Sequence, residues 1–557
     1  MSRTDEKKLV RLQLGGLPLL HSIVKRIGLR EILQNYVPTH GNETVSTIDT
    51  LILLVYNLVL GKDPLYKLEE WINRIDLRSV HLDCYNPNQF SDDRFGRALD
   101  KLYQADRASI MTELVLRVVE KFAIQTDRIH NDSTTVKAFG EIPGKTKSGF
   151  TLHHGHSKDH RPDLKQLLFN LSITADGAVP IHYKAYPGNR TDDTTHIETW
   201  KSLCKLCGKK DFIYVADSKV CTDEQLETIV RAGGRIITIM PETWGEVRQF
   251  KDRLRKNFKN KTEILRKKKN DLTNDYEYFS CFDGEYKTEK RGYSIHWIFS
   301  SEKKKRDQRS REIRLKKAEK ALMELNSKIN KCHLKKQDEI ESAAQSILKE
   351  HQVLSFITIH IAQTEEREKK QVGKGRPGGQ TKYKIKSRLF YTLTWYRDKS
   401  ALEQERRVDG IFPLLSTDDS LSAKEVLRAY KYQPRLEKRF SQFKSIHKAA
   451  PLFFKSIERV ESNMFVFFIS LIVQSLLERE IRNSMQLNGI SSLKIYPEGR
   501  ESKLPTTNCV LDALEGISRY QIVSNDKLQE EYMDDLSKSQ MEVLSLIKMK
   551  QKEFWNN

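Results

Sequence analysis

Three acidic residues that lie far apart in the sequence have the setting expected of a metal-binding carboxylate cluster. Asp217 follows the apolar run FIYVA, residues 212–216, which is typical of a buried strand. Asp132, within RIHNDSTTVKAFG, is expected at the end of the first strand of the same sheet. On neighbouring strands the two carboxylates would repel each other unless a divalent cation compensated their charge. Oxygen ligands suit Mg²⁺ or Mn²⁺, and two such ions about 3.5–4 Å apart support phosphoryl transfer.

A third carboxylate, which the second ion needs, is offered by Glu437 in the segment YKYQPRLEKRFSQFK. Pro434 predicts the start of a helix, and Glu437 then lies in the first turn, where the helix dipole favours the ionised carboxylate. Lys444 is seven residues, or two helical turns, further on and is expected on the same face. Its ammonium group could hold a phosphate beside the metal ions.

Each of these acids also has a purely structural interpretation. Asp217 can cap the turn that follows its strand, because Asp is common at such turns. Asp132 can form an Asx turn with Ser133 and Thr134. Asp127, five residues before Asp132, competes with it as the first metal ligand. A single acid therefore decides nothing, and the hypothesis depends on all three.

The elements that must position these acids change in kind along the chain. Residues 17–122 have apolar spacings of 3 and 4, which predict an all-α N-terminal region. A mixed α/β sheet flanked by helices is expected next, and Asp176-Gly177 predicts a hairpin within it. Strands are predicted at 166–174, 179–186, 212–216 and 235–239, and helices near 194–206 and 224–231.

A charged segment then separates this sheet from Glu437. It contains a strand-like stretch at 293–300 and a short heptad stripe from Leu315 to Ile329, which can lie on its own domain or support self-association. The sequence KGRPGG, residues 374–379, is interpreted as a linker or, through Arg376, as a minor-groove contact. Later helices are expected at 422–429, from Pro434, and at 464–477.

The order Asp132, Asp217 and Glu437, with a long charged insertion before the third acid, resembles the DDE transposases of bacterial insertion sequences. The similarity is closest to the subgroup with an insertion domain and a Y-x2-R-x3-E-x6-K signature, which Tyr430, Glu437 and Lys444 match, although Gln433 replaces the Arg. GHSKDHRPDLKQ (155–166) and YPGNRTDDTT (186–195) also resemble family stretches, so the similarity covers roughly 125–480.

This resemblance implies a ribonuclease H-like core with the order β1-β2-β3-α-β4-α-β5-α. It also implies a DNA transposase that binds terminal inverted repeats and catalyses strand cleavage and strand transfer with two Mg²⁺ or Mn²⁺ ions. Asp132, Asp217 and Glu437 would hold the metals. Tyr430, Gln433 and Lys444 would face DNA. Trp297 is expected in the core by default, and the resemblance offers stacking on a flipped base as the alternative.

Five segments follow from these patterns. They are a helical N-terminal domain at 1–122 as a candidate for DNA binding, core segments at 123–240 and 409–482, an inserted charged domain at 241–408 with strands and a helical segment, and a helical tail at 483–557. Two other functions stay open: a DNA-binding protein without catalysis, and a metal-dependent nuclease without strand transfer.

Composition favours a polyanionic partner. Ninety-six Lys and Arg against seventy-five Asp and Glu give a net charge of +21, which makes nucleic acid the first partner to test. The resemblance implies that this partner is double-stranded DNA, namely transposon ends and target DNA. With 38% hydrophobic and 31% charged residues the chain is expected to be globular rather than disordered. Its longest uninterrupted apolar runs are shorter than the roughly 20 residues of a membrane span. The charged N-terminus has no signal-like apolar segment, so a cytoplasmic protein is expected. The resemblance further implies a bacterial, nucleoid-associated protein that acts as a homo-oligomer on DNA.

Overall fold

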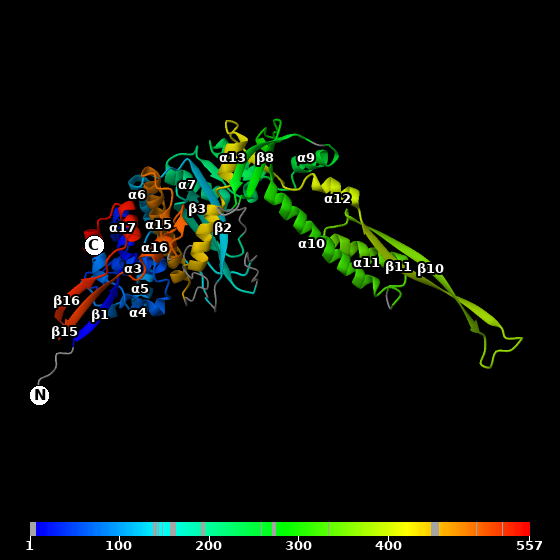
Figure 1. The fold of residues 1–557 in the computed structure, drawn as a ribbon, viewed down its shortest axis with the longest axis horizontal. Helices are drawn as coiled ribbons and strands as arrows, with labels where there is room; N and C mark the ends of the chain where they lie inside the picture. Colours follow the sequence, from blue (N-terminus) through cyan, green and yellow to red (C-terminus); the bar gives the residue numbers. More distant parts are fainter. Residues whose placement is uncertain are drawn as a thin grey trace. The chain divides into compact units, whose positions relative to one another are not determined.

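The computed structural model describes residues 7–137, 142, 144–146, 149–155, 163–190, 195–257, 259–269, 274–331, 334–446, 456–496, 498–525 and 527–556. The chain forms two compact units (Figure 1). Unit 1 comprises Met1–Thr238 and Arg428–Asn557, and unit 2 comprises Ile239–Leu427. The stretches 156–162 and 191–194, which carry much of the family-like sequence noted above, lie outside the described residues.

The N-terminal part of unit 1 is mainly helical, as the apolar spacing predicts. Its α-helices are α1 (Leu17–Ile27), α2 (Leu29–Tyr36), α3 (Thr47–Val59), α4 (Leu68–Ile72), α5 (Asp92–Gln104) and α6 (Arg107–Lys121). Helix α3 begins where its N-cap Ser46 accepts hydrogen bonds from the N–H groups of Ile48 and Asp49. Every residue of α3 is buried, so this helix belongs to the core of the unit.

A mixed sheet follows, and the predicted mixed α/β character is confirmed. Its strands are β2 (Arg128–Lys137), β3 (Gln166–Thr174), β4 (Pro180–Pro187), β5 (Ile213–Val215) and β6 (Arg235–Ile239). They lie in the order β4-β3-β2-β5-β6, in which β3 is antiparallel to both β4 and β2, whereas β2, β5 and β6 are parallel to one another. The helices α7 (His196–Cys207) and α8 (Asp223–Arg231) connect the strands that run parallel.

The remainder of unit 1 returns to this sheet. The end of α13 (Ala423–Tyr430) leads into α14 (Pro434–Ser441), the π-helix η6 (Gln442–Ile446) and α15 (Ile457–Leu487). Helix α15 is long and apolar enough to span a membrane by composition, but 94% of its apolar window is buried inside the protein. It packs on α1, α3, α5 and β4, so it is the central core helix that joins the N-terminal helices to the sheet.

The two ends of the chain differ from the helical segments predicted for them. Strand β1 (Lys7–Gln13) pairs antiparallel with β15 (Ser518–Ser524), which also pairs with β16 (Lys527–Met533). The other elements of this region are β13 (Leu493–Lys494), β14 (Glu501–Ser502), α16 (Thr507–Leu514), α17 (Lys538–Leu546) and α18 (Gln551–Asn556). The tail is therefore not all helical, because a short charged strand is stabilised only by a partner strand about 500 residues away in the sequence.

Unit 2 combines an antiparallel sheet with a helical hairpin. Its elements are α9 (Gly245–Lys256), β7 (Lys261–Lys268), β8 (Tyr276–Phe282), β9 (Ser294–Ser300), α10 (Ser301–Asn326), α11 (Gln337–Glu350), β10 (Ile357–Gln371), β11 (Tyr383–Arg397), α12 (Lys399–Arg406) and β12 (Ile411–Ser416). The sheet order is β12-β9-β8-β7. The apolar stripe from Leu315 to Ile329 is buried against α11 and the start of the β10–β11 hairpin, so it is covered within this unit.

Candidate active site

The sheet of unit 1 brings two of the predicted acids to the same place. Strands β2 and β5 are parallel, and their last paired residues are His130 and Val215. Asp132 and Asp217 each follow these paired residues by two positions, so both lie just beyond the point where β2 and β5 stop pairing. Asp132 lies inside β2 rather than at its end, because β2 continues its pairing with β3 beyond the point where β5 stops.

The surroundings of the two acids differ from those of the rest of their strands. Most residues of β2 are buried, whereas the side chain of Asp132 is half-buried. Asp217 keeps 37% of its side chain exposed, although Ile213–Val215 are buried. The competing acid Asp127 precedes β2 at its other end, is 74% exposed and pairs with Lys209. The sheet therefore opens to solvent at Asp132 and Asp217, and Asp127 lies away from them.

Asp217 performs the turn-capping role that the sequence allows. Its Oδ1 atom accepts a hydrogen bond from the N–H of Lys219 at 3.1 Å. Its backbone oxygen accepts a bond from the hydroxyl of Thr238 at 2.7 Å. A carboxylate offers about four acceptor positions, so this cap is compatible with metal ligation.

A buried histidine that the sequence interpretation did not identify lies beside Asp217. The Nε2 atom of His196 is 3.7 Å from Oδ1 of Asp217 and has no hydrogen-bond partner among the described residues. Its Nδ1 atom lies 3.1 Å from the hydroxyl of Tyr214. Burial raises the pKa of Asp217, but His196 and the N–H of Lys219 outweigh burial and hold this pKa below its usual value. The carboxylate is therefore ionised at neutral pH, as a metal ligand must be.

Helix α14, which carries Glu437, is fixed to β2 through Gln433. The side-chain Nε2 of Gln433 donates to the backbone oxygen of Asn131 at 3.1 Å, and its Oε1 lies 3.2 Å from Nδ1 of His130. Burial lowers the pKa of His130 to about 4, so its ring is neutral at pH 7 and can donate from Nδ1. Glu437 is one helical turn after Gln433 and so lies on the same side of α14, with its side chain exposed.

The pKa of Tyr430, the last residue of α13, is affected by the charges of all three acids. Burial raises its pKa to about 12, with further contributions from the charges of Asp217, Asp132 and Glu437, in that order. The hydroxyl is therefore protonated at neutral pH and can donate a hydrogen bond. Tyr214 responds in the same way to Asp217 and Asp132, since burial and these two charges raise its pKa. The charges of Asp217, Asp132 and Glu437 therefore all act on Tyr430.

The chemistry of this site fits a hard divalent cation. Its donors are carboxylate oxygens, and the orphaned, buried Nε2 of His196 faces one of them. Among the described residues, no three or more His, Cys, Asp or Glu side chains are already arranged as a set that could hold a metal ion.

The predicted DNA contacts around Glu437 have two different outcomes. Gln433 is occupied by β2, so its observed role is to position α14 instead of contacting phosphate. Lys444 lies in the π-helix Gln442–Ile446, so the α-helical spacing that placed it on the face of Glu437 does not apply unchanged.

The two predicted contacts in unit 2 also differ. Trp297, on β9, is 1% exposed and stacks on Phe250 with ring centroids 3.9 Å apart. This core position contradicts a role as an exposed base wedge, because β9 pairs on both sides and directs this side chain inward. Arg376 is exposed, but KGRPGG is the tip of the β10–β11 hairpin rather than a linker between segments.

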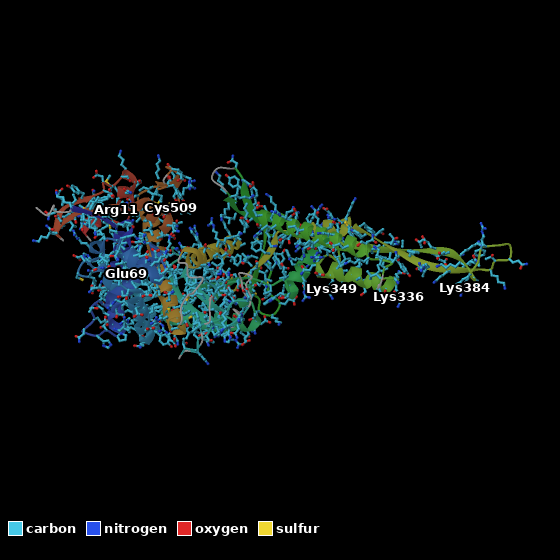
Figure 2. The ribbon with its side chains drawn as sticks, turned by 90° about the horizontal axis from the view of Figure 1, so that it is seen from below. Arg11, Glu69, Lys336, Lys349, Lys384 and Cys509 are labelled. Carbon is cyan, nitrogen blue, oxygen red and sulfur yellow. The ribbon has the colours of Figure 1, made fainter. Side chains whose placement is uncertain are left out.

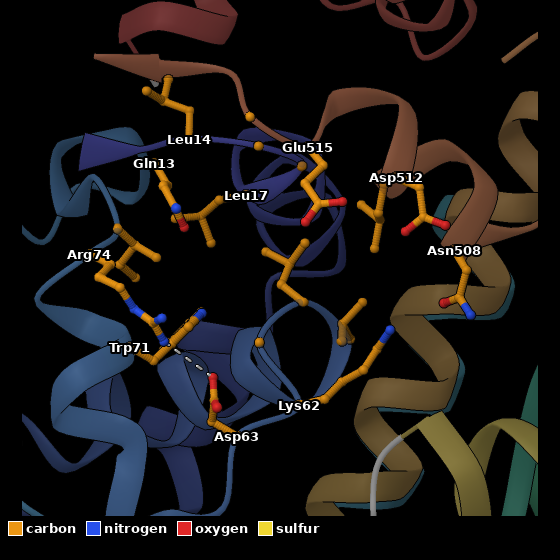
Figure 3. Close-up of a pocket in the computed structure, with 18 of the residues that line it drawn as sticks. Gln13, Leu14, Leu17, Lys62, Asp63, Trp71, Arg74, Asn508, Asp512 and Glu515 are labelled. Carbon is orange, nitrogen blue, oxygen red and sulfur yellow. Dashed lines mark ion pairs between the residues drawn. The ribbon is translucent and has the colours of Figure 1, made fainter. Parts of the chain in front are cut away.

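A cavity of about 640 Å³ lies elsewhere in unit 1 (Figure 3). The N-terminal helices contribute Lys62, Asp63 and Trp71 to its wall, and the region of α16 contributes Asp512 and Glu515. Figure 3 shows Asp63 paired with Arg74 at its rim. None of the three candidate metal ligands lines this cavity, so it is separate from the acidic site.

Replacing Gln433 by Ala tests its positioning role. The change removes both contacts to β2, so Glu437 should lose its fixed position, and DNA cleavage should fall about 10- to 100-fold. DNA affinity should change less than twofold, because Gln433 is engaged by protein. Gln486→Ala, at an exposed position on α15, is the matched control. A parallel loss of affinity and cleavage in the Gln433 variant would show instead that this residue contacts DNA.

Comparisons with known proteins give two findings. The family described as "Domain of unknown function (DUF4277)" matches residues 10–116, which run from β1 into α6. A cryo-EM structure of the piggyBac transposase synaptic complex with hairpin DNA is similar with a TM-score of 0.24 and 13% identity. That alignment covers 51% of this chain and 60% of that chain, which is less than two thirds of its length. A search of curated proteins gives no match. The match to DUF4277 is therefore confined to the N-terminal part of unit 1.

Proposed function

We propose that this protein is a DNA transposase of the DDE type. The observation that carries the proposal is that three carboxylates distant in sequence, Asp217, Asp132 and Glu437, all act on the pKa of one half-buried hydroxyl, that of Tyr430. A turn cap or an Asx turn explains one acid at a time. Neither explains why Glu437, on a helix more than 200 residues further along the chain, also acts on Tyr430.

The element order of unit 1 supports a ribonuclease H-like core. Three antiparallel strands are followed by α7, β5, α8 and β6, with β2 between β3 and β5. This is the sequence of elements that the resemblance implies, with unit 2 inserted between β6 and the helix that carries Glu437. Carboxylates at the exposed ends of a rigid sheet are held more accurately than carboxylates on loops.

In this proposal Asp132, Asp217 and Glu437 hold two Mg²⁺ or Mn²⁺ ions. When bound, these ions would make a hydroxyl oxygen more nucleophilic and would stabilise the charge that develops on the leaving oxygen. His196 orients the carboxylate of Asp217, and Gln433 keeps Glu437 beside β2. The protonated hydroxyl of Tyr430 donates to the phosphate of the cleaved end, with Lys444 as a second cationic contact.

The reaction consists of two phosphoryl transfers at the same site. In the first, a water oxygen forms a bond to phosphorus while the bond to the 3′ oxygen breaks, which leaves a 3′ hydroxyl at the end of the element. In the second, the oxygen of that hydroxyl forms a bond to a phosphorus of target DNA while the bond from this phosphorus to the target 3′ oxygen breaks, which joins the element to a target 5′ phosphate and leaves a target 3′ hydroxyl. Joining two ends to one target requires two copies of the chain, so a homo-oligomer on DNA is part of the proposal.

The test is an assay with labelled terminal-repeat DNA, a supercoiled target plasmid and Mg²⁺. Cut ends and joined products are expected, and EDTA should remove both while leaving DNA binding, with Mg²⁺ or Mn²⁺ in excess restoring them. Cutting without joining would identify a nuclease. Repeat-specific binding without cutting would identify a DNA-binding protein that lacks catalysis. Activity that persists in EDTA would refute the metal site.

A further inference from the structure

The β10–β11 hairpin of unit 2 is much longer than its supporting core. The two strands pair without a register shift from Ile357 with Arg397 to Gln371 with Tyr383. Fifteen residues per strand correspond to about 50 Å. At the base, Ile357, Tyr391 and Leu393 belong to the core formed with α10 and α11. In Figure 1 the strands continue beyond α11.

The outer part of this hairpin has no protein covering it. From residue 362 to residue 389 the side chains are exposed apart from the partly buried Gln371 and Thr381. Val372, Tyr383 and Ile385 are 51–60% exposed, although they are large and apolar. An isolated two-stranded ribbon is only marginally stable in water, so a bound partner would add contacts that the protein itself does not provide.

Charge identifies the kind of partner. Residues 369–386, termed the distal ribbon, contain no acidic residue. They contain seven basic residues: Lys369, Lys370, Lys374, Arg376, Lys382, Lys384 and Lys386. Figure 2 shows Lys384 on this ribbon, beyond Lys336 and Lys349 on α11. Such a concentration of cations attracts a polyanion.

The strand register shows which charged side chains face each other across the hairpin. Toward the base, Glu366 faces Arg388 and Glu368 faces Lys386, so opposite charges are paired across the strands. Further out, Lys370 faces Lys384 directly. Like charges in this position destabilise a ribbon, and Glu368 offers Lys370 only an exposed partner at 3.6 Å. A phosphate backbone would remove this repulsion.

We propose that the distal ribbon binds duplex DNA by entering the major groove. The groove is about 12 Å wide and admits a two-stranded β-ribbon, whose strands are about 4.8 Å apart. Lysines on both faces then meet the phosphates on either side. At the tip, Gly373 and Gly375 have φ values of 110° and 149°, which let the chain turn tightly and present Lys374 and Arg376. The proposal assigns to the transposase a second DNA contact, separate from the acidic site, and rests on the proposed function for its biological role.

The test uses the full-length protein with Lys370, Lys374, Arg376 and Lys384 all replaced by Gln. The matched control replaces Lys316, Lys317, Lys320 and Lys328, which are exposed on and just after α10, so that net charge falls equally. Affinity for labelled duplex DNA is measured over a range of salt concentrations. Affinity falls as salt rises, so the slope of log affinity against log salt is negative. Its magnitude should decrease by about 3 to 4 in the ribbon variant and by less than 1 in the control.

Several outcomes would overturn the proposal. An unchanged slope in the ribbon variant would contradict it. An equal decrease in the control would also contradict it, because the effect would then come from the net charge of the protein and not from the ribbon. Equal affinity of the wild-type protein for duplex RNA would also do so, because the major groove of RNA is deep and narrow. Thermal unfolding should be the same for all three proteins, since the replaced side chains are exposed. A conservative second variant, Arg376→Gln alone, should lower the slope by about 1.

The cleavage assay separates this inference from the proposed function. A wild-type protein that binds duplex DNA through the ribbon but never cuts would refute the transposase and leave the ribbon contact. A wild-type protein that cuts and joins, together with a ribbon variant of unchanged salt dependence, would refute only the ribbon contact.

Discussion

Asp217→Asn is expected to reduce both cleavage and strand transfer by at least about 10³-fold, because it removes a charge that the metal ions require. The substitution conserves shape, and the amide oxygen can still accept the N–H of Lys219, which now bonds Oδ1 at 3.1 Å. The turn should therefore remain intact. Binding to terminal repeats should be unchanged, and so should the midpoint of thermal unfolding. Product yields on gels and binding isotherms measure the two quantities separately.

Asp127→Asn is the matched control for this experiment. Asp127 is an exposed acid of the same segment, but it precedes β2 and pairs with Lys209 at the opposite end of the strand. Its replacement should leave both activities within about twofold of wild type, because exposed ion pairs contribute little. The assignment of Asp217 fails if its variant keeps a tenth or more of wild-type cleavage, or if the Asp127 variant is equally inactive.

Arg439→Met is expected to lower the free energy of unfolding of unit 1 by about 3–5 kcal/mol, since it removes the nearer of the two cations that pair with a buried carboxylate. Arg439 and Glu478 are 3% and 2% exposed and lie 3.0 Å apart. Burial raises the pKa of Glu478, but Arg439 and then Arg482 outweigh it and hold this pKa below its usual value. Arg439 also donates to the backbone oxygens of Gly177 and Ala178, both at 3.1 Å, and so ties α14 to the β3–β4 turn.

A double variant provides the control. Arg439→Met combined with Glu478→Met removes both charges. The free energy of unfolding of this double variant should exceed that of Arg439→Met alone by at least about 1 kcal/mol. Urea unfolding followed by circular dichroism measures these differences. Cleavage should fall in the single variant, because α14 carries Glu437. A single variant that loses less than about 1 kcal/mol, or a double variant that is no better, would contradict this account of the pair.

Much of the local structure of this chain is encoded in short stretches of sequence. The Asp176-Gly177 pair predicts the turn between β3 and β4, and Pro434 predicts the first residue of α14, both of which the structure confirms. The apolar run before Asp217 predicts a buried strand, and β5 is that strand. These signals are local, because turn geometry, proline and hydrophobic periodicity act over a few residues.

Side-chain partners could not be predicted in the same way. Gln433 was assigned to DNA from its place in a motif, but His130 and Asn131, some 300 residues earlier, engage it. His196 lies one residue past a family-like stretch and gave no signal of its own, because its significance depends on a buried Nε2 beside Asp217. Trp297 could be exposed or buried on an inserted strand until the neighbours of that strand were known.

The sequence by itself determined the types of element, their order along the chain and the three acids that deserve testing. Only the tertiary structure decided that β2 and β5 run side by side up to His130 and Val215, that α14 contacts β2, and that a Gly-rich stretch is the tip of a long basic ribbon. The reason is physical: turns and helix starts are fixed by neighbouring residues, whereas strand order and buried polar contacts depend on which distant segments share a core.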